Sequence, residues 1–185
     1  MKPGVRALGV AESFSDDRST LAGVVVRASR VVDGFAFGSC AVGGTDVTDA
    51  IVALFDDLGR EDVRYLLVSG IAPAWFNIID LHTLQQRVDR PVISVTYEGS
   101  DGLAPALREQ FDGDELATRL ETYRRQPSRR ELTVNDETVF VRSVGIDDGD
   151  ASGVVRAFTP EGGRPEPLRV ARLAARAADQ WEAAN

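Results

Sequence analysis

Two carboxylates stand where metal-assisted chemistry could take place. Glu12 closes an apolar run of residues 5–12, and Asp46 follows an aromatic-rich run of residues 31–42. In open α/β sheets, ligands bind at the carboxyl ends of strands, and two carboxylates there can hold Mg²⁺ or Mn²⁺ against a phosphodiester. Glu12 and Asp46 are therefore the catalytic and metal-binding candidates. The alternatives stay open: Glu12 as a solvated strand-end acid, and Asp46 as a helix N-cap.

A second candidate region follows the apolar run of residues 63–70. Ser69 and Gly70 end this run, and Trp75, Phe76 and Asn77 come next. One interpretation is a substrate-binding platform, on which a nucleobase stacks while Asn77 forms hydrogen bonds with it. The other interpretation is a hydrophobic plug in which Asn77 caps a helix.

The cysteine and histidine content limits the kinds of site. Cys40 and His82 are the only residues of their types, so an internal disulfide is excluded and a Cys/His zinc site nearly so. A metal site must use oxygen ligands, which favours magnesium or manganese. Cys40 is expected in the core and His82 on a helix surface.

The charge composition bears on the partners. The net charge is −8 and Lys2 is the only lysine, a composition that suggests adaptation to high salt. Such acidity argues against nucleic-acid binding at ordinary salt. In molar salt the Debye length is roughly 3 Å, so local arginines decide. The sequence offers one arginine cluster for phosphate contacts, with simple solvation as its alternative: Arg124, Arg125, Arg129 and Arg130.

The apolar runs of the sequence are short. None approaches the roughly 20 residues that span a bilayer, and the amino-terminal segment lacks the apolar core of a signal peptide. We therefore expect a cytoplasmic protein with no membrane contact.

The first part of the chain predicts a mixed α/β sheet. Residues 5–12, 20–29 and 31–42 read as a three-stranded antiparallel meander, followed by a helix over residues 47–58. A buried strand over 63–70, a helix over 76–88 and a strand over 91–97 complete a βαβ unit. The prediction is a five-stranded sheet flanked by helices.

Residues 99–185 are predicted as an extension of this core, which covers about residues 4–98. Helices are expected over 102–111 and 114–126, and a hairpin over 130–144 that turns at Asn135-Asp136. A short helix within 147–159 and a final helix over 165–184 follow. With no linker composition between the parts, residues 1–185 are predicted to form a single domain.

Several segments together resemble a known family. The segments "ALGVAESF", "GGTDVTDAI", "LLVSGIAPAWFNIIDL", "RPVISVTYE" and "PEPLRVARLAARAA" resemble an archaeal family related to endonuclease V. This family, long catalogued as domain of unknown function ninety-nine, is also called endonuclease dU. The resemblance covers nearly the whole chain. It implies a ribonuclease-H-like fold and a Mg²⁺- or Mn²⁺-dependent hydrolase that repairs DNA with deaminated bases such as deoxyuridine.

The acidic pattern of endonuclease V is only partly present. The resemblance places its first Asp on Ala11, its second acid on or near Asp46 and its third on Ser69. Adjacent strand residues point to opposite faces, so Glu12 replaces Ala11 only if the strand bends or ends there.

Two functional hypotheses follow from this departure. In one, a rearranged acidic site uses Glu12 and Asp46 with Asp80 or Glu98, and the protein is a metal-dependent endonuclease. In the other, cleavage is lost and the protein is a catalytically inactive nucleic-acid-binding or regulatory protein on the same fold.

Overall fold

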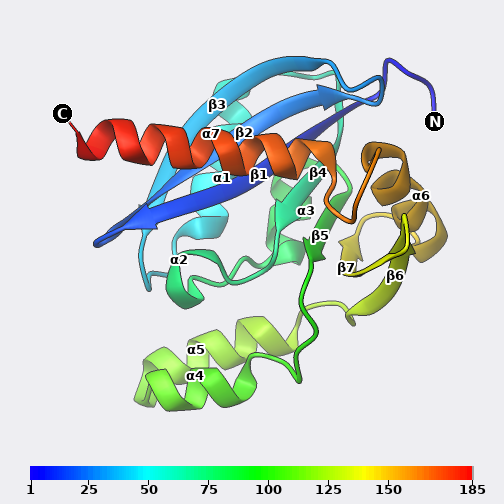
Figure 1. The fold of residues 1–185 in the computed structure, drawn as a ribbon. Helices are drawn as coiled ribbons and strands as arrows, with labels where there is room; N and C mark the ends of the chain where they lie inside the picture. Colours follow the sequence, from blue (N-terminus) through cyan, green and yellow to red (C-terminus); the bar gives the residue numbers. More distant parts are fainter. Residues whose placement is uncertain (185) are drawn as a thin grey trace.

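The fold is built on one twisted sheet of seven strands in the order β3-β2-β1-β4-β5-β7-β6. The computed structural model describes residues 1–184, with Ser15 by its backbone alone. Figure 1 shows the sheet with α7 crossing it. The strands are β1 (Arg6–Ser15), β2 (Arg18–Arg27), β3 (Val32–Ala41), β4 (Val63–Ser69), β5 (Val92–Thr96), β6 (Arg130–Val134) and β7 (Glu137–Val144).

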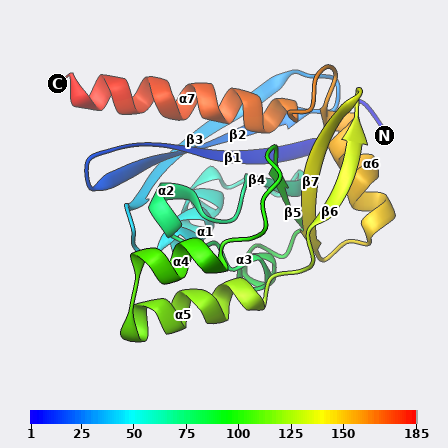
Figure 2. The ribbon, with the colours of Figure 1, turned by 60° about the horizontal axis from the view of Figure 1, so that its bottom comes forward.

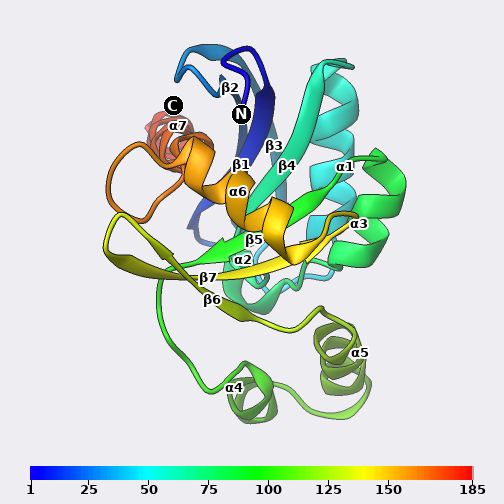
Figure 3. The same ribbon diagram turned by 90° about the vertical axis from the view of Figure 1, so that its right-hand side faces the viewer.

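Helices cover both faces of this sheet. They are α1 (Val47–Leu58), α2 (Pro73–Phe76), α3 (Leu81–Val88), α4 (Ala104–Gln110), α5 (Gly113–Arg124), α6 (Asp148–Phe158) and α7 (Glu166–Ala183). Figure 3 shows α1 and α3 on one face and α6 and α7 on the other. Figure 2 shows α4 and α5 lying together, away from α7. No helix among residues 1–184 has the length and apolar character needed to cross a membrane.

The predicted fold class is confirmed. Strands β1, β2 and β3 form the antiparallel meander, and β4 runs parallel to both β1 and β5. Leu66, Leu67 and Val68 of β4 are almost fully buried because helices pack on both of its faces. Because β4 and β5 pair in parallel, their carboxyl ends lie side by side.

The predicted hairpin is part of the sheet. Strand β7 pairs antiparallel with β5, and β6 pairs with β7, so the sheet has seven strands where five were expected. The alternating residues Val139 and Val141 are buried and join Ile93 and Val95 in one apolar cluster with α6. Alternation in the sequence predicts a hairpin but does not identify the strand that it pairs with.

The helix predicted over 76–88 begins later. Asp80 is the N-cap of α3, and its side chain accepts hydrogen bonds from the backbone amides of His82 and Thr83. Residues 74–76 have positive φ angles, so α2 is a single irregular turn, and an extended link joins it to α3. This link carries the buried residues Ile78 and Ile79, whose apolar character made the helix prediction too long.

An ion-pair network joins β1, β2 and β3 at the edge of the sheet opposite the carboxyl end of β4. Asp33 accepts hydrogen bonds from Arg27 at 2.7 and 2.9 Å, and it also pairs with Arg6 and Arg60. The hydrogen bond from Arg27, followed by that from Arg6, holds the pKa of Asp33 far below its usual value. A carboxyl with a depressed folded-state pKa stabilises the fold above its unfolded pKa near 4, and this contribution is lost as the pH falls.

We therefore expect Asp33→Asn to reduce the acid sensitivity of the protein. Between about pH 5 and pH 2 the wild type should lose more unfolding free energy than the variant, because only the wild type must protonate this carboxylate. Urea unfolding across this pH range measures the difference. Asp57→Asn, at an exposed position of α1, is the control. Parallel pH profiles for wild type and Asp33→Asn would contradict the assignment.

Candidate functional site

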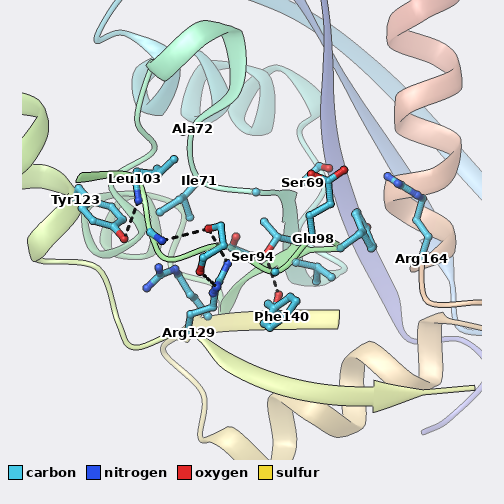
Figure 4. A pocket seen from close by; sticks show the side chains of 18 of the residues that line it. Ser69, Ile71, Ala72, Ser94, Glu98, Leu103, Tyr123, Arg129, Phe140 and Arg164 are labelled. Atoms are coloured by element: carbon cyan, nitrogen blue, oxygen red, sulfur yellow. Dashed lines mark hydrogen bonds between the residues drawn. The ribbon is translucent and has the colours of Figure 1, made fainter. Parts of the chain in front are cut away.

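The carboxyl ends of β4 and β5 open into a cleft of about 640 Å³. Ser69, Gly70 and Ser94 line its inner part. In Figure 4, Tyr123 and Arg129 lie toward one end of this cleft, and Arg164 lies at the other end beside α7. The volume falls within the range of about 300–1,000 Å³ that is typical of small-ligand sites.

Arginines dominate the charged lining. Five of them line the cleft, with Glu98 as the acidic residue among the described lining residues, in a chain whose net charge is −8. We call this site the arginine-lined cleft. Its arginines are Arg129, Arg142, Arg164, Arg172 and Arg176. A local excess of guanidinium groups in an acidic protein favours an anionic ligand, because phosphate and carboxylate match the guanidinium fork.

Aromatic rings support three of these guanidiniums. The Arg164 guanidinium lies 3.8 Å from the ring centroid of Tyr97, and that of Arg129 lies 4.4 Å from the ring of Phe140. Arg142 lies 5.9 Å from the ring centroid of Tyr123. Such cation–π contacts orient a guanidinium while leaving its N–H groups able to donate.

Tyr97 lies deep in the cleft wall. Burial raises its pKa to about 12, while the nearby charges of Arg164 and Arg172 act in the opposite direction. Its hydroxyl is buried and has no hydrogen-bond partner among residues 1–184. The phenol of Tyr97 therefore stays protonated at neutral pH and can donate a hydrogen bond. In the same cleft, burial lowers the pKa of the Arg142 guanidinium.

Glu12 and Asp46 lie on the α1 face of the sheet. Glu12 accepts a hydrogen bond of 2.8 Å from Ser19, and Asp46 accepts one of 2.7 Å from Asn77. Both carboxylates lie near the buried thiol of Cys40. Burial first, then the charges of Asp46 and Glu12, raise the pKa of Cys40 to about 11. The structure thus brings these two predicted residues into one neighbourhood and makes Cys40 an inert core residue.

Ala11 lies on the opposite face from Glu12. It is 4% exposed and belongs to an apolar cluster with Val24 and with Ala171 of α7. Strand β1 continues past Glu12 to Ser15, in unbroken register with β2. The strand neither bends nor ends at Glu12, so Glu12 does not reach the face that Ala11 occupies.

The predicted metal set of Glu12, Asp46 and Asp80 is not assembled. One oxygen of Asp80 caps α3, and the other accepts a 2.8 Å hydrogen bond from Arg125. Within residues 1–184, no group of three or more His, Cys, Asp or Glu side chains could hold a metal ion. The cavity lined by Glu12 and Ser69 is only about 10 Å³, which is hardly room for one water molecule. These donors do not fit a magnesium or manganese site.

Within the predicted nucleobase platform, Asn77 holds the local fold together, whereas Trp75 is 45% exposed. Asn77 is fully buried, and its amide donates to the Ala41 carbonyl oxygen and to Asp46 and accepts from the Val47 amide. Trp75 packs against Phe76 and Phe111, with ring centroids 5.7 and 5.3 Å away. Within the described lining of the cleft, Ser69 and Gly70 are the predicted binding residues that remain, because the aromatic rings pack toward α4 and α5.

The predicted arginine cluster divides among several places. Arg129 lines the cleft, while Arg125 pairs with Asp80 and Arg130 with Asp148. The sequence interpretation missed Arg142, Arg164, Arg172 and Arg176. Arg172 and Arg176 are four residues apart on α7, a spacing that places both on one helix face and could have identified them.

Comparison with known proteins identifies relatives whose sequences match this chain over almost its full length. A family model described as "Endonuclease dU" matches residues 3–179. The UPF0215 protein TK2033 of Thermococcus kodakarensis is 35% identical over 187 residues, with 96% of this chain and 93% of the relative covered. A UPF0215 protein of Pyrobaculum calidifontis is also 35% identical, with 91% and 93% covered.

Solved structures share the fold. A protein of unknown function from Archaeoglobus fulgidus superposes with a TM-score of 0.82 at 24% identity, with 94% of this chain and 97% of that one covered. Human ENDOV gives a TM-score of 0.67 at 16% identity, with 96% and 85% covered. Ciona intestinalis endonuclease V, in complex with a DNA that contains an inosine followed by a ribo-adenosine, gives 0.64 at 12% identity, with 95% and 86% covered.

Proposed function

We propose, since this chain belongs to the endonuclease dU family, that it binds nucleic acid containing a deaminated base, such as deoxyuridine, in the arginine-lined cleft. The family and the endonuclease V-like fold support a nuclease scaffold. The observation that carries the proposal is the concentration of five arginines and one acid at the carboxyl ends of the central strands. A role in repair of deaminated DNA in the cytoplasm is part of the same proposal.

The cleft offers both phosphate and base contacts. Guanidiniums at its rim suit the phosphodiester backbone, which supplies most of the affinity in nucleic-acid complexes. Ser69 and Ser94 line its inner part and offer hydroxyl groups to the carbonyl oxygens of a deaminated base. Ciona endonuclease V, a relative in fold, was solved in complex with DNA that contains an inosine.

Phosphodiester hydrolysis is the second candidate. It is favoured by the proximity of Glu12 and Asp46, because the charges of both carboxylates raise the pKa of the Cys40 thiol. A carboxylate in this position could accept a proton from an attacking water molecule. Recognition without cleavage is preferred, because Ala11 and Ser69 stand where the family resemblance calls for acids and these donors do not fit a metal site.

The test compares two duplexes that differ by one methyl group. A labelled duplex with deoxyuridine opposite guanine should bind about tenfold more tightly than one with thymidine opposite guanine, because a fitted pocket excludes the extra methyl group. Fluorescence anisotropy at low and at molar potassium chloride measures this. Equal affinity for both duplexes and for a fully paired one would overturn the proposal.

A cleavage measurement on the same duplexes separates the two candidates. Incubation with magnesium or manganese, followed by denaturing electrophoresis, should leave the deoxyuridine strand intact. A cut strand that is absent with Glu12→Gln and with Asp46→Asn would replace the first candidate with the second.

A further inference from the structure

We infer that the arginine-lined cleft holds phosphate groups directly through Arg164, Arg172 and Arg176, with no divalent cation between protein and phosphate. The inference rests on the proposed function and specifies how that function is carried out. It starts from the mismatch between the donors present and a metal site.

The five arginines of the cleft fall into two groups. Arg129 donates to the carbonyl oxygen and to the hydroxyl of Ser100, and Arg142 donates to the carbonyl oxygen of Pro127. These two guanidiniums hold the cleft walls together. For Arg164, Arg172 and Arg176, no hydrogen bond or ion pair is formed with any other residue in the described part of the chain. Their N–H groups are therefore available to a ligand.

The three available arginines come from one segment. Arg164 precedes α7, and Arg172 and Arg176 are one helical turn apart on it. Ala171 and Ala175 are fully buried where α7 packs on β1 and β2, which fixes the neighbouring arginines at the cleft. Figure 4 shows Arg164 beside this helix and across from Ser69.

The segment that carries these arginines lies beside the two positions at which the expected acids are missing. Ala171 shares an apolar cluster with Ala11, and Arg172 and Ser69 line the same cleft. Ala11 and Ser69 are the two positions at which the resemblance calls for metal-binding aspartates. Where a nuclease would place carboxylates and a cation, this chain places neutral side chains and guanidiniums. A guanidinium carries the positive charge itself and donates two parallel hydrogen bonds to a phosphate.

The buried hydroxyl group of Tyr97 is independent evidence for a ligand in the cleft. Its hydroxyl is buried in the wall of the cleft with no partner among residues 1–184, flanked by the charges of Arg164 and Arg172. A buried hydroxyl without a partner destabilises the free protein. A phosphate oxygen held by these two arginines would be an acceptor for it.

The experiment measures binding of a short fluorescein-labelled oligodeoxythymidine, which contains phosphates but no deaminated base. In EDTA and in magnesium at matched ionic strength, the wild type should bind with equal affinity. Three phosphate contacts predict a slope of about −2 in a plot of log affinity against log salt. The triple variant with Arg164→Gln, Arg172→Gln and Arg176→Gln should bind at least about 30-fold more weakly and with a slope near zero.

Arg64→Gln is the matched control. Arg64 is also exposed and lies over a tyrosine ring, at 5.6 Å from the Tyr65 centroid, but at the opposite end of β4. This variant should bind like the wild type. The single variant Arg172→Gln, at an exposed position, should show about tenfold weaker binding and covers the case in which the triple variant fails to fold.

Two results would overturn the inference. One is binding that requires magnesium and is lost in EDTA. The other is a loss with Arg64→Gln as large as that with Arg172→Gln. Neither result would alter the preference for deoxyuridine over thymidine, so the proposed function is tested separately.

Discussion

Replacing Asn77 with alanine is expected to lower the free energy of unfolding by about 1–3 kcal/mol, because the buried Val47 amide loses its acceptor. The Asn77 side chain is fully buried. It donates to the Ala41 carbonyl oxygen at 2.9 Å and accepts from the Val47 amide at 3.1 Å. It thereby ties the end of β3 to the start of α1. Equilibrium unfolding in urea measures the change.

The same variant separates the two interpretations of Asn77. Gln110→Ala, at an exposed position at the end of α4, should leave the unfolding free energy nearly unchanged. If Asn77→Ala kept wild-type stability while losing nucleic-acid binding, Asn77 would have to contact the ligand, and its structural assignment would be wrong.

Gly9→Ala should destabilise the protein by about 3 kcal/mol and displace α7. A Cβ atom at Gly9 would lie 2.3 Å from the carbonyl carbon and 2.5 Å from the carbonyl oxygen of Pro167. Backbone cannot yield as a flexible side chain does, so overpacking of this kind costs about 1–3 kcal/mol and occasionally more. Because α7 carries Arg172 and Arg176, oligonucleotide affinity should fall together with stability. Urea unfolding and anisotropy on the same sample measure both.

Gly153→Ala provides the opposite expectation within the same protein. Gly153 lies inside α6, and nothing approaches the position of its added Cβ within 4 Å. Alanine should therefore stabilise the helix by up to about 1 kcal/mol. If Gly9→Ala were as benign as Gly153→Ala, the close seating of α7 on β1 would be incorrect.

Local patterns in the sequence predicted the elements better than their partners. The β-branched runs and the 3–4 spacing of Val47, Ile51 and Leu54 identified the meander and α1 correctly. The pairing of β7 with β5 was missed, because pairing between strands distant in sequence leaves no local signal. The positive φ angles at residues 74–76 were missed for a similar reason, since tertiary packing imposes them on side chains that normally avoid this region.

The site was predicted in part from the strand-end rule. Ser69 and Gly70, which were predicted as binding residues because they end a buried central strand, line the cleft, and their contact with a ligand stays a prediction. The sequence left Asn77 open between a ligand contact and a helix cap, because it carries no direct measure of burial, and the structure shows that Asn77 is fully buried. Four of the five arginines were missed because they converge from segments between residues 142 and 176, and spaced arginines on a helix usually form a solvated face.

Photocrosslinking locates the bound strand most directly. An oligonucleotide with 4-thiodeoxyuridine, which has no C5 substituent, at a central position is irradiated in complex with the protein, and the crosslinked peptides are identified by mass spectrometry. The arginine-lined cleft predicts crosslinks to Tyr97, Tyr123 or Phe140. Crosslinks to Trp75, or to the exposed Phe35 and Phe37 of β3, would place the nucleic acid elsewhere and contradict the account.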